Sequence, residues 1–418
     1  MRLRTTHRAV QRGPAAQRFV LKGTPLVVLA GAWSAAAYLL WDSTTVPGDL
    51  SRPHLAVSRF FSPHLLHRTA DYAAFGRWDW VLSEMALLVT FALYARHGVR
   101  FMRESAAGRV GTGMLLGMLG FAILWLVQIP FRLADFWWER RHHVAHGGYV
   151  AYVLADWLQL GGIFVSLSLT LAIVMGLAGL LGRRWWILGG PVFVAMAALF
   201  IFVSPYLTSL HRVHDPVLAA QAKAIARSEG VGDVPLRVQD VGKRTDEVNA
   251  YSFGLGPSRR VVLWSTFLDG RFPSSDLRFV IAHEYGHQAH RHLWKGLAWY
   301  ALFAFPGAYL IERATRRRGG MRAPEAVPLS LLVLVVLNLA ALPLQNLISR
   351  HFEAEADWSA LRATRDPAAG RDLFEKFATT SLAEPSPPTW DFVLLEDHPT
   401  LIQRIEMVEA WKARSRRG

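Results

Sequence analysis

Residues 279–290 read Phe-Val-Ile-Ala-His-Glu-Tyr-Gly-His-Gln-Ala-His and contain the pattern HExxH at residues 283–287. Two histidines four positions apart lie on one face of a helix and can place two imidazole nitrogens on one metal ion. The glutamate beside the first histidine is placed to take a proton from metal-bound water. The alternative is a helix with two ordinary, hydrogen-bonded histidines, and the surrounding sequence must decide between the two interpretations.

The polar segment that leads into this pattern, residues 211–295, predicts a small α+β unit. Residues 214–229 have the periodicity of an amphipathic helix. Residues 235–241, 249–255 and 260–266 are typical of short strands with Gly, Pro, Asp and Asn at the breaks. Residues 273–276 read Pro-Ser-Ser-Asp, which favours a helix start, and that helix continues through the HExxH pattern.

A third metal ligand is expected from residues 346–357, Asn-Leu-Ile-Ser-Arg-His-Phe-Glu-Ala-Glu-Ala-Asp. The metzincin spacing fails, because it needs Gly and His where His290 and Leu293 stand. Glu353 and Asp357 lie four apart on one helical face. Glu353 would complete a His/His/Glu set with an open fourth position, and Asp357 could accept the second ring N–H of a bound histidine. The alternative is an amphipathic helix with an exposed acidic face.

Several neighbouring residues are less suited to hold the same ion. His290 and His292 are too close along the helix to be obvious partners, and we expect them at solvated or interfacial positions. His351 and Glu355 do not fit the four-residue spacing. The chain has no cysteine, so a metal must be held by His, Asp or Glu, and disulfides, zinc-thiolate sites and cysteine nucleophiles are excluded.

The composition indicates a membrane protein, since 52% of the 418 residues are hydrophobic and only 19% are charged. This argues against a single soluble globule and excludes a disordered or fibrous chain. We predict seven spans, of which the second and sixth are short for the ~20 residues that a crossing needs. The runs are 24–41, 80–95, 110–131, 157–182, 185–210, 296–311 and 326–349.

The net charge of +14 fits membrane topology and anionic lipid better than nucleic acid, which we exclude as a partner. We expect a multi-pass protein of the cell (plasma) membrane with the bilayer as a partner. The predicted organisation is a membrane region with five spans (1–210), a catalytic segment (211–295), a helical hairpin of spans six and seven (296–349), and a second catalytic segment (350–418). The fold class is a mainly α seven-helix transmembrane bundle with a zincin-like α+β metallopeptidase unit containing a short sheet.

These motifs resemble the CAAX prenyl protease 1 family of membrane zinc metallopeptidases. The family shares HExxH and a downstream element matched here by Asn346, Ser349, Arg350, Glu353, Ala356 and Asp357. It also has an Asn-Ala segment on a strand, matched here by Asn249-Ala250. A late His-Pro followed by Arg is matched by His398-Pro399 with Arg404. A looser stretch before the fourth span is matched by residues 139–147 with Asp156-Trp157.

The resemblance implies a role for each matching residue. His283, His287 and Glu353 would bind Zn2+, with Glu284 as the general base. Asn249 and Ala250 would lie on an edge strand that pairs with an extended substrate. His398 would steady the oxyanion or be merely structural, and for Arg350 we expect a structural ion pair with an acidic neighbour.

The predicted function is a zinc metalloendopeptidase of the gluzincin type, which hydrolyses peptide bonds with a zinc-activated water and Glu284 as general base. Its substrate is a peptide or protein, for which a lipidated or membrane-associated tail is one candidate. The alternatives are a general quality-control protease for membrane proteins and a non-catalytic membrane scaffold that keeps the zinc site. A channel or transporter is disfavoured, because Glu84 is the only ionisable residue within the spans. The distribution of Lys and Arg predicts that the catalytic part lies outside the cell, whereas the family resemblance implies that it lies in the cytosol. Both sides of the membrane are therefore kept as alternatives for the catalytic part.

Overall fold

The computed structural model describes residues 29–102, 108–154 and 157–416, and the chain forms two compact units, residues 1–43 and 44–418. In the first unit residues 29–42 are helical. The first predicted span, 24–41, therefore lies partly outside the described residues, as does Asp156 of the looser family match. The other helices and the strands described below belong to the second unit.

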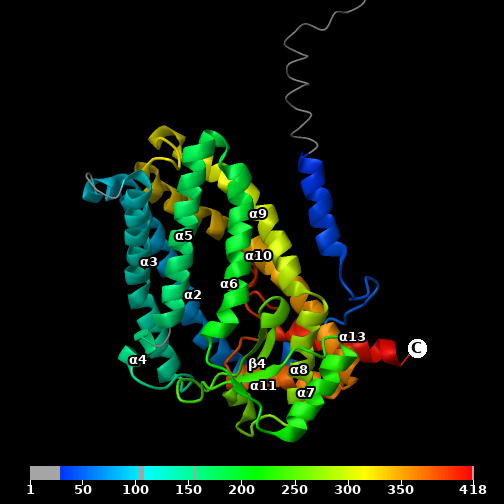
Figure 1. Cartoon of the computed structure of the whole chain (residues 1–418). Helices are drawn as coiled ribbons and strands as arrows, with labels where there is room; N and C mark the ends of the chain where they lie inside the picture. Colours follow the sequence, from blue (N-terminus) through cyan, green and yellow to red (C-terminus); the bar gives the residue numbers. More distant parts are fainter. Residues whose placement is uncertain (1–28, 103–107, 155–156, 417–418) are drawn as a thin grey trace, which may run out of the picture. The chain divides into compact units, whose positions relative to one another are not determined.

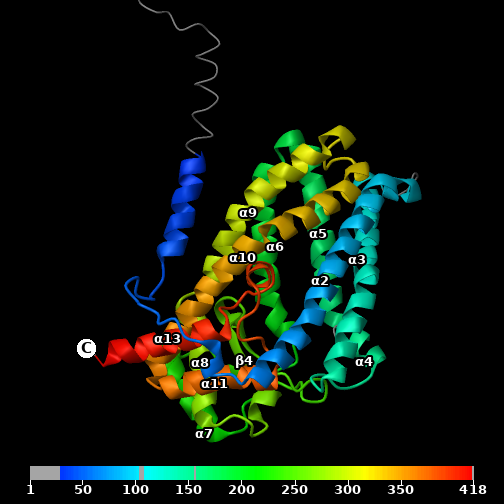
Figure 2. The same cartoon turned by 180° about the vertical axis from the view of Figure 1, so that it is seen from behind.

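Long helices in the second unit pack into a closed series (Figures 1 and 2). Each packs on the next, and the last packs back on the first. In this order they are α2 (Pro63–His97), α3 (Gly108–Arg141), α5 (Trp157–Leu181), α6 (Trp186–Leu207), α9 (His292–Thr315) and α10 (Val327–Thr364). Aliphatic and aromatic side chains such as Phe91, Leu116 and Val327 fill the contacts between them.

Among the described residues, 5 helices are long and apolar enough to cross a membrane: α2, α3, α5, α6 and α10. They contain five of the predicted runs. The run 80–95 is not short, because α2 begins at Pro63, where the Ser62 side chain accepts a hydrogen bond from the Leu65 N–H. The run 296–311 lies in α9, which is not one of the five, so seven crossings remain a prediction.

A four-stranded mixed sheet lies at one end of these helices (Figure 1). Its strand order is β1 (His211–Arg212), β2 (Leu236–Gln239), β4 (Arg260–Trp264) and β3 (Ala250–Phe253). β2 runs parallel to β4, and β3 pairs antiparallel with β4 at one edge of the sheet. The last three strands lie within the predicted ranges, whereas β1 has only two residues, too few for an alternating pattern.

Shorter helices make up much of the rest of the second unit, and three of them begin at a capping side chain. They are α4 (Tyr149–Leu154), α7 (Pro216–Ser228), α8 (Ser274–Ala289), α11 (Pro367–Thr380), α12 (Thr389–Leu394) and α13 (Leu401–Ser415). Asp215 caps α7, and Thr400 caps α13. A core that includes Leu263, Phe279, Phe374 and Ile405 joins the sheet to α8, α11 and α13.

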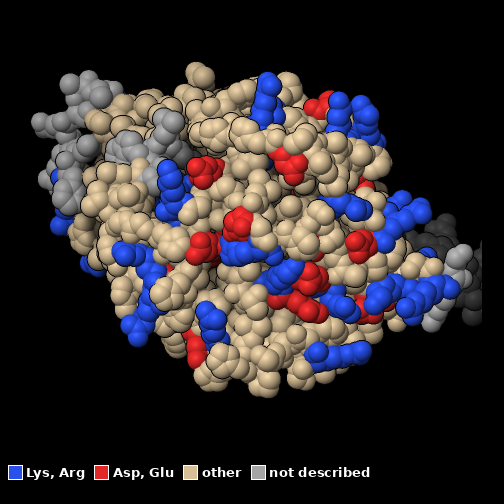
Figure 3. Space-filling model, turned by 90° about the horizontal axis from the view of Figure 1, so that it is seen from below, with Lys and Arg blue, Asp and Glu red and all other residues tan. Residues whose placement is uncertain are grey.

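Charged side chains are interspersed on the face formed by this end of the molecule. Figure 3, seen from below Figure 1, shows Lys and Arg beside Asp and Glu rather than one large patch of either sign. Such a mixed surface is suited to water, in contrast to the apolar helices described above.

In the sheet region α8 packs closely on α10. A Cβ atom added to Gly286 would lie 3.0 Å from the Cβ of Ser359 and 3.4 Å from the Cα of Ala356. Glycine lets the two helices lie this close, and any side chain here would require the neighbouring atoms to shift by a few tenths of an ångström. The predicted boundary at residue 350 lies inside α10, so the seventh predicted span and the following acidic element form one 38-residue helix.

We expect Gly286→Val to lower the free energy of unfolding by about 1–3 kcal/mol, because the added methyl groups force α10 away from α8. Thermal unfolding of the detergent-purified chain measures this effect. Gly179→Val is the matched control, since Gly179 is exposed in α5 and a Cβ atom added to it would have no atom within 4 Å. Equal unfolding temperatures for the two variants would contradict the close approach.

Candidate metal centre

The three predicted metal ligands come together where α8 meets α10. His283 Nε2 lies 3.1 Å from His287 Nε2, and Glu353 places Oε2 at 3.2 Å from the first nitrogen and Oε1 at 3.3 Å from the second. All three potential ligand atoms lie within 4.8 Å of one another, and no other such group of three or more His, Asp or Glu occurs among the described residues. Donor atoms so arranged can contact one cation.

The chemistry of this group fits a bound metal ion. The Oε2 atom of Glu353 is buried and accepts no hydrogen bond from any described residue. A buried carboxylate oxygen in that state is costly, and a cation would supply its partner. Although burial lowers the pKa of His283, the hydrogen bond to Asp357 and the negative charges of Glu353 and Asp357 outweigh it and raise the pKa to about 10. The surroundings therefore favour positive charge at this point.

Asp357 lies beside the first histidine on the side away from the three ligand atoms. Its Oδ1 atom is 2.9 Å from His283 Nδ1, which is the contact expected from the sequence. Arg404 of α13 donates two further hydrogen bonds to the same carboxylate, from Nε at 2.8 Å and from Nη2 at 2.6 Å. Because a carboxylate accepts the Nδ1 proton, Nε2 is the nitrogen of His283 left to bind a cation.

Glu284 is buried next to the ligand group and lines a cavity of about 290 Å³. Asn249, Ala250 and His398 line the same cavity. Ala250 opens β3, and the carbonyl oxygen of Asn249 accepts a hydrogen bond from the Trp264 N–H of β4. Burial raises the pKa of Glu284, while the charges of His283 and His287 oppose the rise.

His398 approaches the ligand group from the segment between α12 and α13. Its Nε2 atom is 3.3 Å from Glu353 Oε2, and its Nδ1 atom is 2.6 Å from Asp397 Oδ1. Burial lowers the pKa of His398, but the negative charges of Glu353 and Asp397 outweigh it and raise the pKa. His398 thus lies beside Glu353 in the ligand group.

Arg350 and Asn346 hold that segment against α10. Arg350 donates to the carbonyl oxygens of Phe392, at 2.7 Å, and Glu396, and its guanidinium lies 4.2 Å from the Phe392 ring centroid. Asn346 donates to the Val393 carbonyl oxygen at 3.3 Å. The expected ion pair of Arg350 with an acidic side chain is not present among the described residues, because carbonyl groups at the end of α12 lie closer.

His292 is not solvated, contrary to our expectation, and is only 5% exposed. It is the first residue of α9, and a left-handed residue, Arg291 at φ 56°, turns the chain so that its ring meets His287. The Nδ1 atoms of the two rings are 2.9 Å apart, and His292 Nε2 lies 2.9 Å from Glu355 Oε2. Burial lowers the pKa of His292 to about 3. The sequence carries a signal for this contact, because His292 and Glu355 both stand close to the two motifs. The criterion of a four-residue spacing, however, excludes both residues.

We expect Arg404→Leu to lower the free energy of unfolding by about 3–5 kcal/mol, because it leaves the buried Asp357 carboxylate without its charged partner. Arg371→Leu is the control, since the Arg371 side chain is 43% exposed and its pair with Glu375 at 3.6 Å contributes only about 0–1 kcal/mol. Thermal unfolding of both variants in one detergent makes the comparison. A similar shift for both would show that Arg404 does not balance a buried charge.

Comparisons with known proteins find similarity to metallopeptidases. Residues 213–412 match Peptidase family M48. The chain is 26% identical to the uncharacterized metalloprotease YhfN of Bacillus subtilis over 242 residues, covering 54% of this chain and 57% of that protein. It is 25% identical to the CAAX prenyl protease 1 homolog of Oryza sativa subsp. japonica over 234 residues, covering 54% of this chain and 55% of that protein.

A solved structure extends the likeness to almost the whole fold. The crystal structure of S. mikatae Ste24p matches with a TM-score of 0.71 and 17% sequence identity, covering 91% of this chain and 96% of that one. The sequence matches to the two curated relatives span only a little more than half of their length. Together with the apolar helices, this fold supports an integral membrane protein. The chain carries a region that matches Peptidase family M48, and its likeness to CAAX prenyl protease 1 homologues in sequence and to Ste24p in fold supports a CAAX prenyl protease-like family.

Proposed function

We propose that the chain is an integral-membrane zinc endopeptidase of the gluzincin type, in which His283, His287 and Glu353 hold zinc and Glu284 is the general base. The observation that carries this proposal is the convergence of the three ligand atoms within 4.8 Å, with Glu284 beside them in the cavity that reaches β3. Two nitrogen donors and one carboxylate are a usual set for a catalytic zinc site.

The reaction we assign is hydrolysis of a peptide bond. Bound zinc supplies a Lewis acid that lowers the pKa of water and polarises a carbonyl group. Glu284 accepts a proton from the attacking water and passes it to the nitrogen of the leaving amine. Asp357, held by Arg404, fixes the ring orientation and tautomer of His283 during these steps.

The edge of the sheet orients the substrate in this proposal. Among the described strands β3 pairs with β4 alone, so its other side can offer backbone N–H and C=O groups to an extended peptide. Asn249 and Ala250 lie on the cavity wall together with Glu284, so a peptide paired there passes the general base. His398 donates a hydrogen bond to the substrate carbonyl oxygen as negative charge develops on it.

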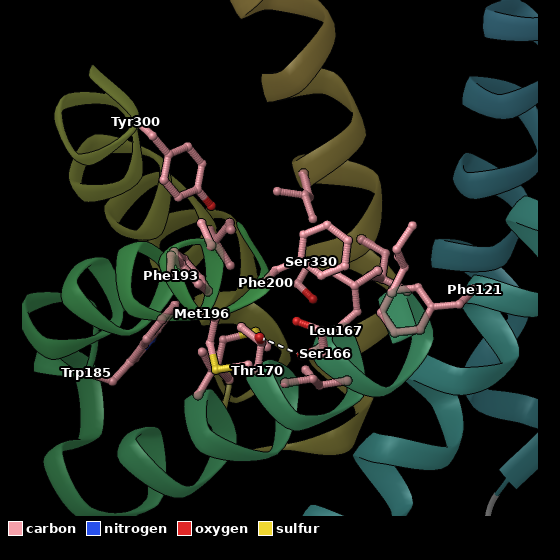
Figure 4. Close-up of a pocket in the computed structure, with 18 residues that line it drawn as sticks. Phe121, Ser166, Leu167, Thr170, Trp185, Phe193, Met196, Phe200, Tyr300 and Ser330 are labelled. Atoms are coloured by element: carbon pink, nitrogen blue, oxygen red, sulfur yellow. Dashed lines mark hydrogen bonds between the residues drawn. The ribbon is translucent and has the colours of Figure 1, made fainter. Parts of the chain in front are cut away.

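An apolar cavity extends from the ligand group into the long helices and supports a membrane-associated or lipidated substrate. Its volume is about 870 Å³, and residues of α6, α9 and α10 line it together with His287 and Glu353. A second cavity of about 330 Å³ lies between α3, α5, α6, α9 and α10 (Figure 4). In this smaller cavity the Thr170 hydroxyl donates a hydrogen bond to the Ser166 carbonyl oxygen at 2.7 Å. None of the three predicted metal ligands lines the smaller cavity. We therefore assign substrate access to the larger cavity.

The proposal includes seven membrane crossings, a zincin-like catalytic unit and the plasma membrane as location. α9 has 24 residues, which at ~1.5 Å per residue is long enough to cross the bilayer. It packs between α6 and α10, which are both candidate spans. Residues 211–295 and 350–418 form the catalytic segments of this arrangement, and residues 1–210 and 296–349 supply the membrane region.

We expect Glu284→Gln to lower the rate of peptide hydrolysis by roughly 10²–10⁴-fold while zinc stays bound, because the amide cannot accept the proton. The measurement is cleavage of a prenylated peptide, the same peptide unmodified, and an unfolded protein, at matched zinc content. Glu375→Gln on α11 is the control and keeps full activity. If zinc-loaded wild-type protein cleaves none of the three substrates, the result favours a non-catalytic scaffold. If it cleaves only the unfolded protein, the result favours a quality-control protease.

Removal of the metal by a chelator is expected to lower the unfolding temperature and to abolish cleavage, both restored by added zinc. Zinc at a thousand times its dissociation constant stabilises the folded state by about 4 kcal/mol. Differential scanning fluorimetry of wild type and Glu353→Ala with and without chelator measures this. The variant should show little response, and an equal response in both proteins would place the metal elsewhere.

A further inference from the structure

The second ring nitrogen of His287 is the start of a buried series of contacts that the proposed reaction does not use. His287 Nδ1 lies 2.9 Å from His292 Nδ1, and His292 Nε2 lies 2.9 Å from Glu355 Oε2. Glu355 is only 1% exposed and sits two residues after Glu353 in α10. The contacts therefore run from one predicted ligand, through α9, to a carboxylate next to another.

The direction of these hydrogen bonds follows from the carboxylate, which only accepts. His292 Nε2 must carry the hydrogen that it donates to Glu355. In the neutral ring Nδ1 is then an acceptor, so the hydrogen between the two rings belongs to His287 Nδ1. This leaves the lone pair of His287 on Nε2, the atom that lies 3.3 Å from Glu353 Oε1.

The two residues are held from several sides. The His292 ring stacks on Phe352 with a centroid distance of 4.6 Å and an angle of 11° between the planes. Glu355 also accepts hydrogen bonds from Lys295 Nζ at 3.1 Å and from the Thr45 backbone N–H at 2.6 Å. Because Lys295 already balances the negative charge of Glu355, His292 does not have to be positively charged and can remain neutral.

The arrangement around His287 parallels the one around His283. There Nδ1 faces Asp357, and that carboxylate is balanced by Arg404. Here Nδ1 faces His292, which passes the contact to a carboxylate balanced by Lys295. Each of the two histidines thus has its Nδ1 hydrogen bond anchored on a buried acid paired with a basic side chain.

We propose that His292 and Glu355 are positioning residues for the metal: they hold His287 in the tautomer and orientation that present Nε2 to the ion. This inference rests on the proposed zinc site and names its partners on the α9 side. Partners of this kind commonly change metal affinity by about 10–100-fold when they are removed.

The test is metal binding by the full chain in detergent, with Co2+ and Zn2+ as probes and a competing chelator to set the free metal concentration. We expect His292→Ala to weaken binding of both ions about 10–100-fold and to shift the visible absorption bands of bound Co2+, because His287 no longer keeps a fixed ring orientation. His292→Asn should recover part of this loss, since its side-chain oxygen can accept the His287 hydrogen.

His290→Ala is the matched control. His290 Nδ1 lies 3.6 Å from Glu355 Oε1, and its ring centroid is 5.9 Å from that of His292, yet the structure gives no contact between it and His287 among the described residues. We expect this variant to bind Co2+ within about threefold of wild type and with unchanged bands. An unfolding scan of each metal-free variant separates loss of the fold from loss of the site.

The outcomes are distinguishable. If wild type binds and His292→Ala matches His290→Ala in affinity and spectrum, the positioning role is wrong and the zinc site stands. If wild type itself binds neither ion, the proposed function fails. If His292→Ala does not fold, His292→Phe decides by the same two readouts, because its ring can stack on Phe352 but has no hydrogen-bonding nitrogen. Wild-type affinity and spectrum in that variant would overturn the proposal.

Discussion

The packing of α8 on α10 at Gly286 is the contact on which the rest of the candidate site depends. The absence of a side chain at this position lets α10 approach until Ala356 and Ser359 touch α8. Close to this contact, the two helices bring His283, His287 and Glu353 within reach of one ion. Because α10 is also a candidate membrane span, the same contact places the site at the end of the helical bundle.

This contact buries four acidic side chains, Glu284, Glu353, Glu355 and Asp357, and the site is organised by how their charges are balanced. Burying a charge is costly unless a partner of opposite charge accompanies it. Asp357 has Arg404, and Glu355 has Lys295. Among the described residues, Glu353 is paired only with the histidines His283, His287 and His398, and its Oε2 atom has no hydrogen bond. A divalent cation relieves this condition.

Two kinds of environment meet at this point. On one side the wall contains a sheet edge and the polar residues Asn249, Glu284 and His398. On the other side an apolar cavity runs between α6, α9 and α10. The loop that carries His398 is tied to α10 through Arg350 and Asn346, so the membrane helix organises both walls.

The sequence alone determined the residue types and their local order: HExxH on one helix, Glu353 and Asp357 on another, three of the strands, and most of the apolar runs. These follow from short-range periodicity, which a helix or strand preserves wherever it lies. Only the tertiary structure decided that His292 and Glu355 meet beside His287, that Arg350 holds backbone carbonyls, and that α10 continues unbroken from membrane to site. Such contacts join residues up to 63 positions apart, as for His292 and Glu355, and depend on how closely helices approach rather than on any local pattern.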